Sequence, residues 1–169
     1  VPHLPQFYAN TLVGYSYSKS LSLPGERIGY LLIPDAVEEF EDTVAAASVA
    51  NRILGFVNAP SLFQRVIGRC AGQQSDMTEY RRNRDVLYRE LTNMGYVCAP
   101  PQGAFYMFPQ CFIPDDKEFC QKAKEYHLLI VPGSTFACPG YFRLAFCVSH
   151  ETVLRSLPAF EKLAQFYGK

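Results

Sequence analysis

Short apolar segments typical of β-strands alternate along this chain with longer segments of helical periodicity. Strands are expected over residues 11–17, 27–33, 96–99, 104–108, 128–131 and 141–148. Helices are expected over residues 35–47, 61–70, 77–94, 115–127 and 149–163. Because strands and helices alternate in this way, the sequence predicts an α/β fold with helices packed on a sheet.

Three residues are expected to mark helix ends. Ser61 and Ser149 stand where helical segments begin, and a serine hydroxyl at an N-cap accepts a backbone N–H. Gly95 follows another helical segment, where glycine readily takes the left-handed conformation that ends a helix. A polar stretch near residue 75 interrupts the pattern, so we expect one domain over residues 1–75 and a second over residues 76–169.

The composition excludes several classes of function. The chain has 16 basic and 16 acidic residues and no formal net charge, which predicts neither a nucleic acid nor an anionic membrane as partner. Its apolar runs are too short to span a bilayer.

The six cysteines form no CxxC pair and lack a histidine at metal-ligand spacing, so we expect no metal and reduced thiols in a cytoplasmic protein. Since Val1 is not an initiator methionine, we expect a piece of a longer protein.

Lys19 directly follows the first expected strand, where the backbone is held rigidly. Ser16, Ser18 and Arg27 lie within eight positions of it, and hydroxyls and a guanidinium are groups that bind a phosphate dianion. A Pro-Gly turn at residues 24–25 would return Arg27 toward the two serines. The segment therefore predicts an amine beside an anion site. It matches neither the GxxxxGK[ST] nor the GxGxxG phosphate motif.

Arg143 is a second candidate, in the last expected strand. Strand alternation places Phe142 and Leu144 on one face and Arg143 and Ala145 on the other. We expect the small neighbours of Arg143 to leave open space above it, which a carboxylate could fill with two parallel hydrogen bonds. The alternatives are a charge on an edge strand or a structural ion pair.

Four segments together resemble one family. SxSK at residues 16–19, followed by PGxRxGY at residues 24–30, resembles the lysine signature of the class I and II aminotransferases of fold type I. PQGAFYMF at residues 101–108, PG at residues 132–133 and YFRLAF at residues 141–146 resemble segments of the same family's small domain. The resemblance is closest to the aspartate-aminotransferase type and covers nearly the whole chain.

The resemblance implies a role for each candidate residue. Lys19 would be the catalytic lysine that forms a Schiff base with pyridoxal 5'-phosphate (PLP). Ser16, Ser18 and Arg27 would bind the cofactor phosphate, and Arg143 would bind the α-carboxylate of the substrate.

The resemblance also implies a place in a larger enzyme. Residues 1–75 would be the C-terminal piece of the PLP-binding large domain, and residues 76–169 the small C-terminal α/β domain. The intact protein would be a homodimeric transferase that moves an amino group between an amino acid, possibly aspartate, and a 2-oxo acid. The upstream residues that contact the cofactor ring would lie before Val1, so we expect this piece alone to be inactive. Two alternatives stay open: another fold type I PLP enzyme, such as a carbon–sulfur lyase or a decarboxylase, and a non-catalytic aminotransferase-like domain.

Overall fold

The computed structural model of the protein describes residues 2–169. The chain divides into two compact units, Val1–Ser75 and Asp76–Lys169. The first unit contains a two-stranded sheet and the second a three-stranded sheet, and both also contain helices. The α/β fold class expected from the sequence is confirmed.

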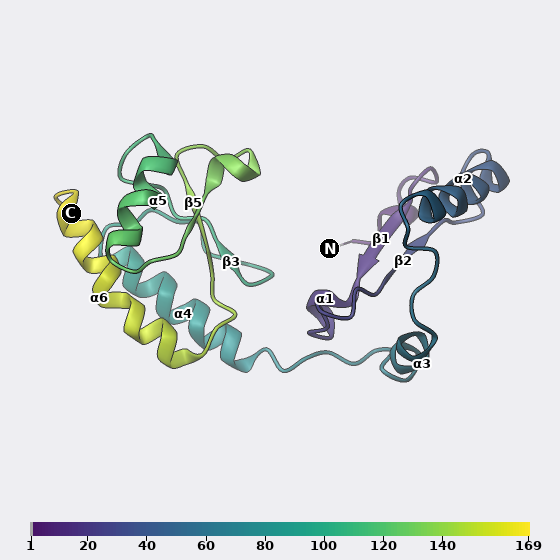
Figure 1. Ribbon diagram of the computed structural model, residues 1–169, viewed down its shortest axis with the longest axis horizontal. Helices are drawn as coiled ribbons and strands as arrows, with labels where there is room; N and C mark the ends of the chain where they lie inside the picture. Colours follow the sequence, from purple (N-terminus) through teal and green to yellow (C-terminus); the bar gives the residue numbers. More distant parts are fainter. Residues whose placement is uncertain (1) are drawn as a thin grey trace. The chain divides into compact units, whose positions relative to one another are not determined.

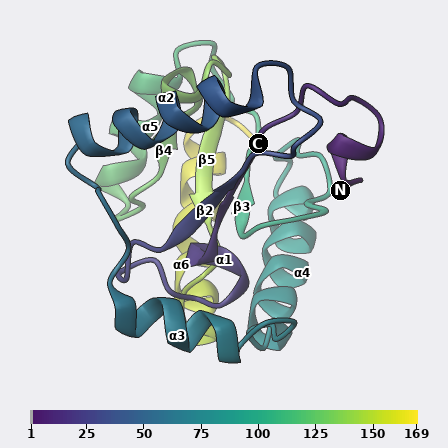
Figure 2. The ribbon, with the colours of Figure 1, turned by 90° about the vertical axis from the view of Figure 1, so that its right-hand side faces the viewer.

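The first unit is a β-hairpin-like ribbon with helices around it (Figure 1). Its elements are the 3-10 helix η1 (Leu4–Gln6), β1 (Val13–Ser16), α1 (Tyr17–Ser20), β2 (Gly29–Leu32), α2 (Phe40–Ile53) and α3 (Ser61–Arg69). Strands β1 and β2 are antiparallel, with Ser16 opposite Gly29. Figure 2, in which this unit faces the viewer, shows α1 at the end of the ribbon where β1 stops.

Apolar side chains of the first unit stay largely in contact with solvent. Ile28 is the one buried hydrophobic residue among those described in this unit. Ile53 is 79% exposed and Phe56 is 71% exposed, although both are large apolar residues. Burying such a side chain stabilises a fold by about 1.5–3 kcal/mol. The described residues of this unit therefore leave most of that stabilisation unused.

Two helix starts in the first unit differ from the sequence prediction. The helix expected from residue 35 begins only at Phe40, because Glu39 has a left-handed backbone (φ 52°) that an α-helix cannot include. Ser61 was expected to be an N-cap, and this was wrong. The N-cap is Pro60, whose carbonyl accepts the amide of Gln64 at 3.1 Å, and Ser61 is the first helical residue.

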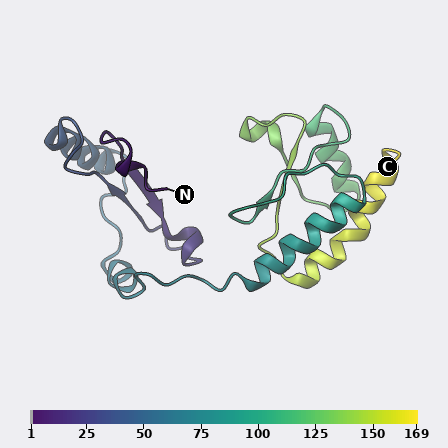
Figure 3. The same ribbon diagram turned by 180° about the vertical axis from the view of Figure 1, so that it is seen from behind.

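The second unit packs three helices against its sheet. Its elements are α4 (Thr78–Asn93), β3 (Tyr106–Met107), α5 (Asp116–Glu125), β4 (Val131–Pro132), the 3-10 helix η2 (Gly133–Phe136), β5 (Phe142–Ala145) and α6 (His150–Phe166). The strands are antiparallel in the order β3-β5-β4. Helices α4 and α6 lie side by side, as Figure 3 shows.

One face of this sheet forms the hydrophobic core. Phe142 and Leu144 of β5 are buried there. The ring of Phe142 stacks on Phe119 of α5 and on Phe160 of α6, with centroid distances of 5.3 and 6.4 Å. The Tyr96 hydroxyl donates to the Phe160 carbonyl at 3.0 Å. The predicted alternation along β5 is thus confirmed, and its other face carries Arg143 and Ala145.

The predicted helix ends in this unit are confirmed at two positions. Ser149 Oγ accepts the Thr152 amide at 3.2 Å at the start of α6, and Gly95 follows α4 with φ +89°. The strand expected over residues 96–99 was wrong. Tyr96 turns its ring into the core, and the Gln110 amide donates to the Val97 carbonyl (2.8 Å) outside any named strand.

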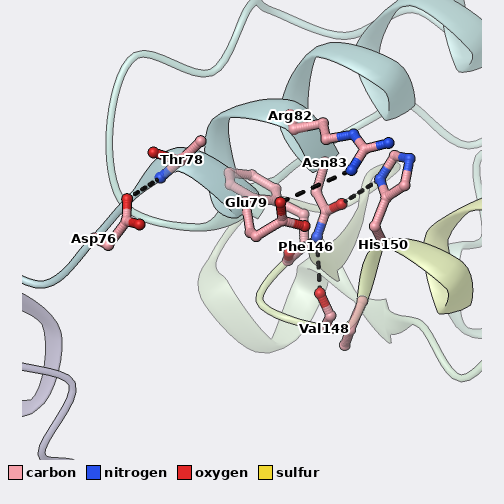
Figure 4. Close-up of polar contacts among 8 residues, drawn as sticks. All are labelled: Asp76, Thr78, Glu79, Arg82, Asn83, Phe146, Val148 and His150. Carbon is pink, nitrogen blue, oxygen red and sulfur yellow. Dashed lines mark hydrogen bonds and ion pairs between the residues drawn. The ribbon is translucent and has the colours of Figure 1, made fainter.

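A buried amide on α4 fixes the segment between β5 and α6 (Figure 4). Asn83 is fully buried, and its Nδ2 donates to the carbonyls of Phe146 at 3.1 Å and Val148 at 2.8 Å. Its Oδ1 lies 2.9 Å from His150 Nδ1. Because an amide oxygen can only accept, His150 carries its proton on Nδ1 in this pair. One side chain therefore satisfies three polar groups.

Replacing Asn83 with leucine is expected to destabilise the protein by about 2–4 kcal/mol, since the new side chain leaves the buried Phe146 carbonyl and two partly buried groups, the Val148 carbonyl and the His150 N–H, without their partner. Urea unfolding of the variant and of the unsubstituted chain measures the difference. Asn93→Leu is a matched control, because Asn93 ends the same helix and is exposed. Equal unfolding free energies for the two variants would contradict this role of Asn83.

Candidate functional site

Lys19 lies in the single helical turn that directly follows β1. Ser16 ends the strand and caps this turn: its Oγ accepts the Ser18 amide at 3.3 Å, and its hydroxyl donates to Ser18 Oγ at 2.9 Å. Lys19 is exposed. One turn of helix thus presents two hydroxyls and an amine.

The pairing of β1 with β2 brings Arg27 to the same end of the ribbon. Ser16 pairs with Gly29, and the Tyr17 amide donates to the Ile28 carbonyl at 3.1 Å. Arg27 directly precedes Ile28, so it lies at the same end of the ribbon as α1. Arg27 adopts a left-handed backbone (φ 50°), and its Nη1 donates to the Pro24 carbonyl at 2.7 Å. Within residues 2–169, no carboxylate forms an ion pair with Arg27, so its charge is available to an anion.

A glycine allows the two strands to approach closely at this end. A Cβ on Gly29 would collide with the carbonyl of Tyr15 and would lie 3.3 Å from Cα of Ser16. Any side chain at residue 29 would therefore push the ribbon apart next to the two serines. Gly29 belongs to the PGxRxGY motif at residues 24–30, and the close approach of Tyr15 and Ser16 is a steric reason for glycine at this position.

Three tyrosines support the ribbon beside Lys19. The Tyr15 ring lies 5.2 Å from the rings of both Tyr17 and Tyr30. Burial, followed by the neighbouring Tyr30 and Tyr15, raises the pKa of Tyr17. These rings hold the end of β1 from which α1 projects.

Arg143 lies on the central strand of the second unit's sheet. Its guanidinium carbon is 4.1 Å from the centre of the Phe136 ring and 4.5 Å from that of Tyr106. The alternative of an edge-strand charge is wrong, because β5 lies between β3 and β4. Among the described residues no carboxylate pairs with Arg143, so the alternative of a structural ion pair finds no support there.

The expectation of open space above Arg143 was wrong. The sequence neighbours Ala145 and Cys147 are small, but aromatic rings from β3 and η2 lie against the guanidinium. Sequence reasoning missed the positions of Tyr106 and Phe136 because only strand register and the turn after β4 bring them near. The structure thus gathers Ser16, Ser18, Lys19 and Arg27 in the first unit, and Arg143 with two rings in the second.

The part of the chain that the structure describes gives little support to a metal site, a reactive cysteine or a membrane span. No group of three histidine, cysteine or acidic side chains gathers there at metal-binding distance. All six cysteines are free. Burial is the first cause that raises the pKa of Cys111 to about 12 and that of Cys120 to about 11, so both thiols remain protonated and unreactive. No helix in residues 2–169 has the length and apolar character needed to cross a bilayer.

Comparison with known proteins gives a consistent result. The sequence model of the family described as "Aminotransferase class I and II" matches residues 4–160. The chain is 28% identical to the aromatic-amino-acid aminotransferase 2 of Thermococcus litoralis, covering 96% of this chain and 43% of that protein. It is also 28% identical to the aspartate/prephenate aminotransferase of Thermus thermophilus, covering 91% of this chain and 41% of that protein.

A solved structure agrees with these relatives. The crystal structure of an amino transferase from Eubacterium rectale superposes on this chain with a TM-score of 0.94 and 52% sequence identity, covering 100% of this chain and 42% of that one. The chain thus spans about two fifths of the length of the proteins it matches.

Proposed function

This chain belongs to the class I and II aminotransferases, and from that premise we propose that the intact protein transfers an amino group between an amino acid and a 2-oxo acid with the cofactor PLP. The observation that carries the proposal is the arrangement at the end of the β1–β2 ribbon. There the amine of Lys19 and two serine hydroxyls lie in α1 and at the end of β1, and Arg27, which forms no ion pair among the described residues, lies just before β2.

The residues at this end of the ribbon fit PLP. The cofactor has an aldehyde, which reacts with a primary amine, and a phosphate dianion. Lys19 supplies the amine, and Ser16, Ser18 and Arg27 supply the donor groups that a phosphate takes. Bound PLP supplies an electron sink for charge that develops at the α-carbon of an amino acid.

We propose the following roles for the chain's own residues. Lys19 holds the cofactor and, when released, moves a proton at the substrate α-carbon, a general acid–base role worth about 10²–10⁴ in rate. Arg143 orients the substrate by two parallel hydrogen bonds to its α-carboxylate. Ser16 and Ser18 hold the cofactor phosphate, and the positive charge of Arg27 compensates the negative charge of that phosphate.

The two units correspond, in this proposal, to two parts of a larger enzyme. Residues 1–75 are the end of the PLP-binding large domain, and residues 76–169 are the small domain. The exposed apolar side chains of the first unit support this assignment, because the rest of the large domain and a second subunit of a homodimer would cover them. All six cysteines are free thiols, and this supports the proposal of a cytoplasmic protein, because the cytoplasm keeps thiols reduced.

We propose aspartate as the amino donor, because relatives of this chain are named aspartate and aspartate/prephenate aminotransferases. The intact protein given aspartate and 2-oxoglutarate is expected to form glutamate and oxaloacetate in equal amounts. A coupled assay for oxaloacetate measures this. The 169-residue chain alone is the comparison, and we expect it to be inactive.

That assay, together with assays of carbon dioxide release and of a sulfur amino acid as substrate, separates the alternatives. A decarboxylase would release carbon dioxide without consuming 2-oxoglutarate. A carbon–sulfur lyase would cleave a sulfur amino acid without needing 2-oxoglutarate. A non-catalytic domain would leave both substrates unchanged. Any of these results with the intact protein would contradict the proposed reaction.

A further inference from the structure

The guanidinium of Arg143 is held by two aromatic rings that come from different elements. Tyr106 pairs with Ala145 across β3 and β5, so its side chain lies on the same face as Arg143, diagonally across the ladder. Phe136 is the last residue of η2. The guanidinium carbon lies 4.5 Å from the Tyr106 ring centre and 4.1 Å from that of Phe136. Both distances are within the range of cation–π attraction.

Helix η2, which ends at Phe136, is tied at its start to β5 and α5. The Gly133 amide donates to the Tyr141 carbonyl at 2.7 Å, just before β5. The Ser134 amide donates to Oδ2 of the buried Asp116 at 2.6 Å, which ties η2 to the start of α5. A Cβ on Gly133 would collide with the Cys138 carbonyl and would lie 2.6 Å from the Tyr141 carbonyl oxygen. The turn is thus anchored at its first two residues, Gly133 and Ser134.

Contacts with ring faces leave the hydrogen-bonding edge of the guanidinium unused. Arginine has five N–H donors in the guanidinium plane, whereas an aromatic ring attracts the positive charge of the group. No carboxylate within residues 2–169 competes for these donors. A long arginine side chain normally loses about 2 kcal/mol of rotamer freedom when it is fixed. Here the rings reduce that freedom before a ligand arrives.

We propose that Phe136 and Tyr106 are positioning residues that hold Arg143 ready for a carboxylate ligand. The inference rests on the proposed function, in which that ligand is the substrate α-carboxylate. The rings act through Arg143, so their loss weakens substrate and inert carboxylates alike. Such a loss raises KM and leaves kcat nearly unchanged.

The test uses the intact, cofactor-loaded protein and the dicarboxylate succinate, which has neither an amino nor an oxo group and binds without reacting. Phe136→Leu and Tyr106→Leu are each expected to weaken succinate binding, measured by calorimetry, by about five- to tenfold. The KM for aspartate should rise by the same factor. Phe136→Tyr keeps a ring and should restore the affinity.

Phe166→Leu is the matched control. Phe166 belongs to the same unit, is 54% exposed, and has Lys122 rather than Arg143 over its ring, at 4.0 Å. Phe136 is itself 43% exposed, so its replacement is expected to leave the fold intact, which circular dichroism verifies.

The outcomes distinguish this inference from the proposed function. Unchanged succinate affinity in Phe136→Leu and Tyr106→Leu, with a normal aspartate reaction in the unsubstituted protein, overturns the positioning role alone. A fall in kcat without a change in KM or succinate affinity also overturns it. If the unsubstituted protein neither binds succinate nor transfers an amino group, both the positioning role and the proposed function fail.

Discussion

Replacing Lys19 with alanine in the intact protein is expected to abolish transamination, because in the proposed function Lys19 supplies both the covalent anchor and the base. The loss of acid–base catalysis alone costs about 10²–10⁴ in rate, and the loss of cofactor attachment adds to it. Lys19→Arg keeps the positive charge but has no primary amine, so it should be equally inactive. Turnover, together with the visible absorbance of the lysine-bound cofactor, measures both effects.

The sequence offers a clear control for this experiment. Lys19 is the only lysine among residues 1–75, and the next one in the chain is Lys117. Lys117 is exposed near the start of α5. Lys117→Ala should therefore keep full activity and absorbance. Undiminished turnover in Lys19→Ala would refute the assignment of Lys19.

Replacing Arg143 with alanine is expected to raise the KM for the amino acid about 100-fold, which corresponds to two lost hydrogen bonds to a charged group at about 1.5 kcal/mol each. Cofactor retention should be unaffected, because Ser16, Ser18, Lys19 and Arg27 lie in the other unit. Arg143→Lys should recover only part of the affinity, since an ammonium cannot make the planar two-point contact. Initial rates and cofactor absorbance of the purified variants measure these effects.

Arg155→Ala controls for the loss of a positive charge. Arg155 is 79% exposed in its side chain on α6 and pairs only loosely with Glu151, at 3.8 Å. Its removal should leave KM unchanged. If Arg143→Ala lost the cofactor while its substrate affinity stayed normal, the role of Arg143 would be wrong.

Sequence predicted the elements that depend on local chemistry. Ser149 caps α6 and Gly95 follows α4 because each acts within one turn of its own helix. The strand predicted over residues 96–99 failed because Tyr96 follows the core rather than a neighbouring strand. Ser61 failed as an N-cap because the preceding proline already ends the irregular segment. Tertiary packing determined the path of residues 96–99, and the restricted backbone of Pro60 determined where α3 begins. A local sequence pattern predicts neither effect.

In the candidate site, too, the features set by local sequence could be predicted and those set by tertiary packing could not. Ser16, Ser18 and Lys19 are within four residues, and a tight turn is enough to return Arg27, so spacing alone could predict their proximity. Alternation along β5 predicted the face on which Arg143 lies. The rings around Arg143 could not be predicted, because they depend on the register of β3 against β5 and on the shape of η2.

The proposed covalent bond between Lys19 and PLP is tested most directly by borohydride reduction of the intact protein, followed by tryptic digestion and mass spectrometry. Trypsin does not cut at a modified lysine, so a label on Lys19 should appear in a peptide that continues through Lys19 and ends at Arg27. A pyridoxyl label on another lysine, or normal cleavage after Lys19 with no label anywhere, would contradict the account.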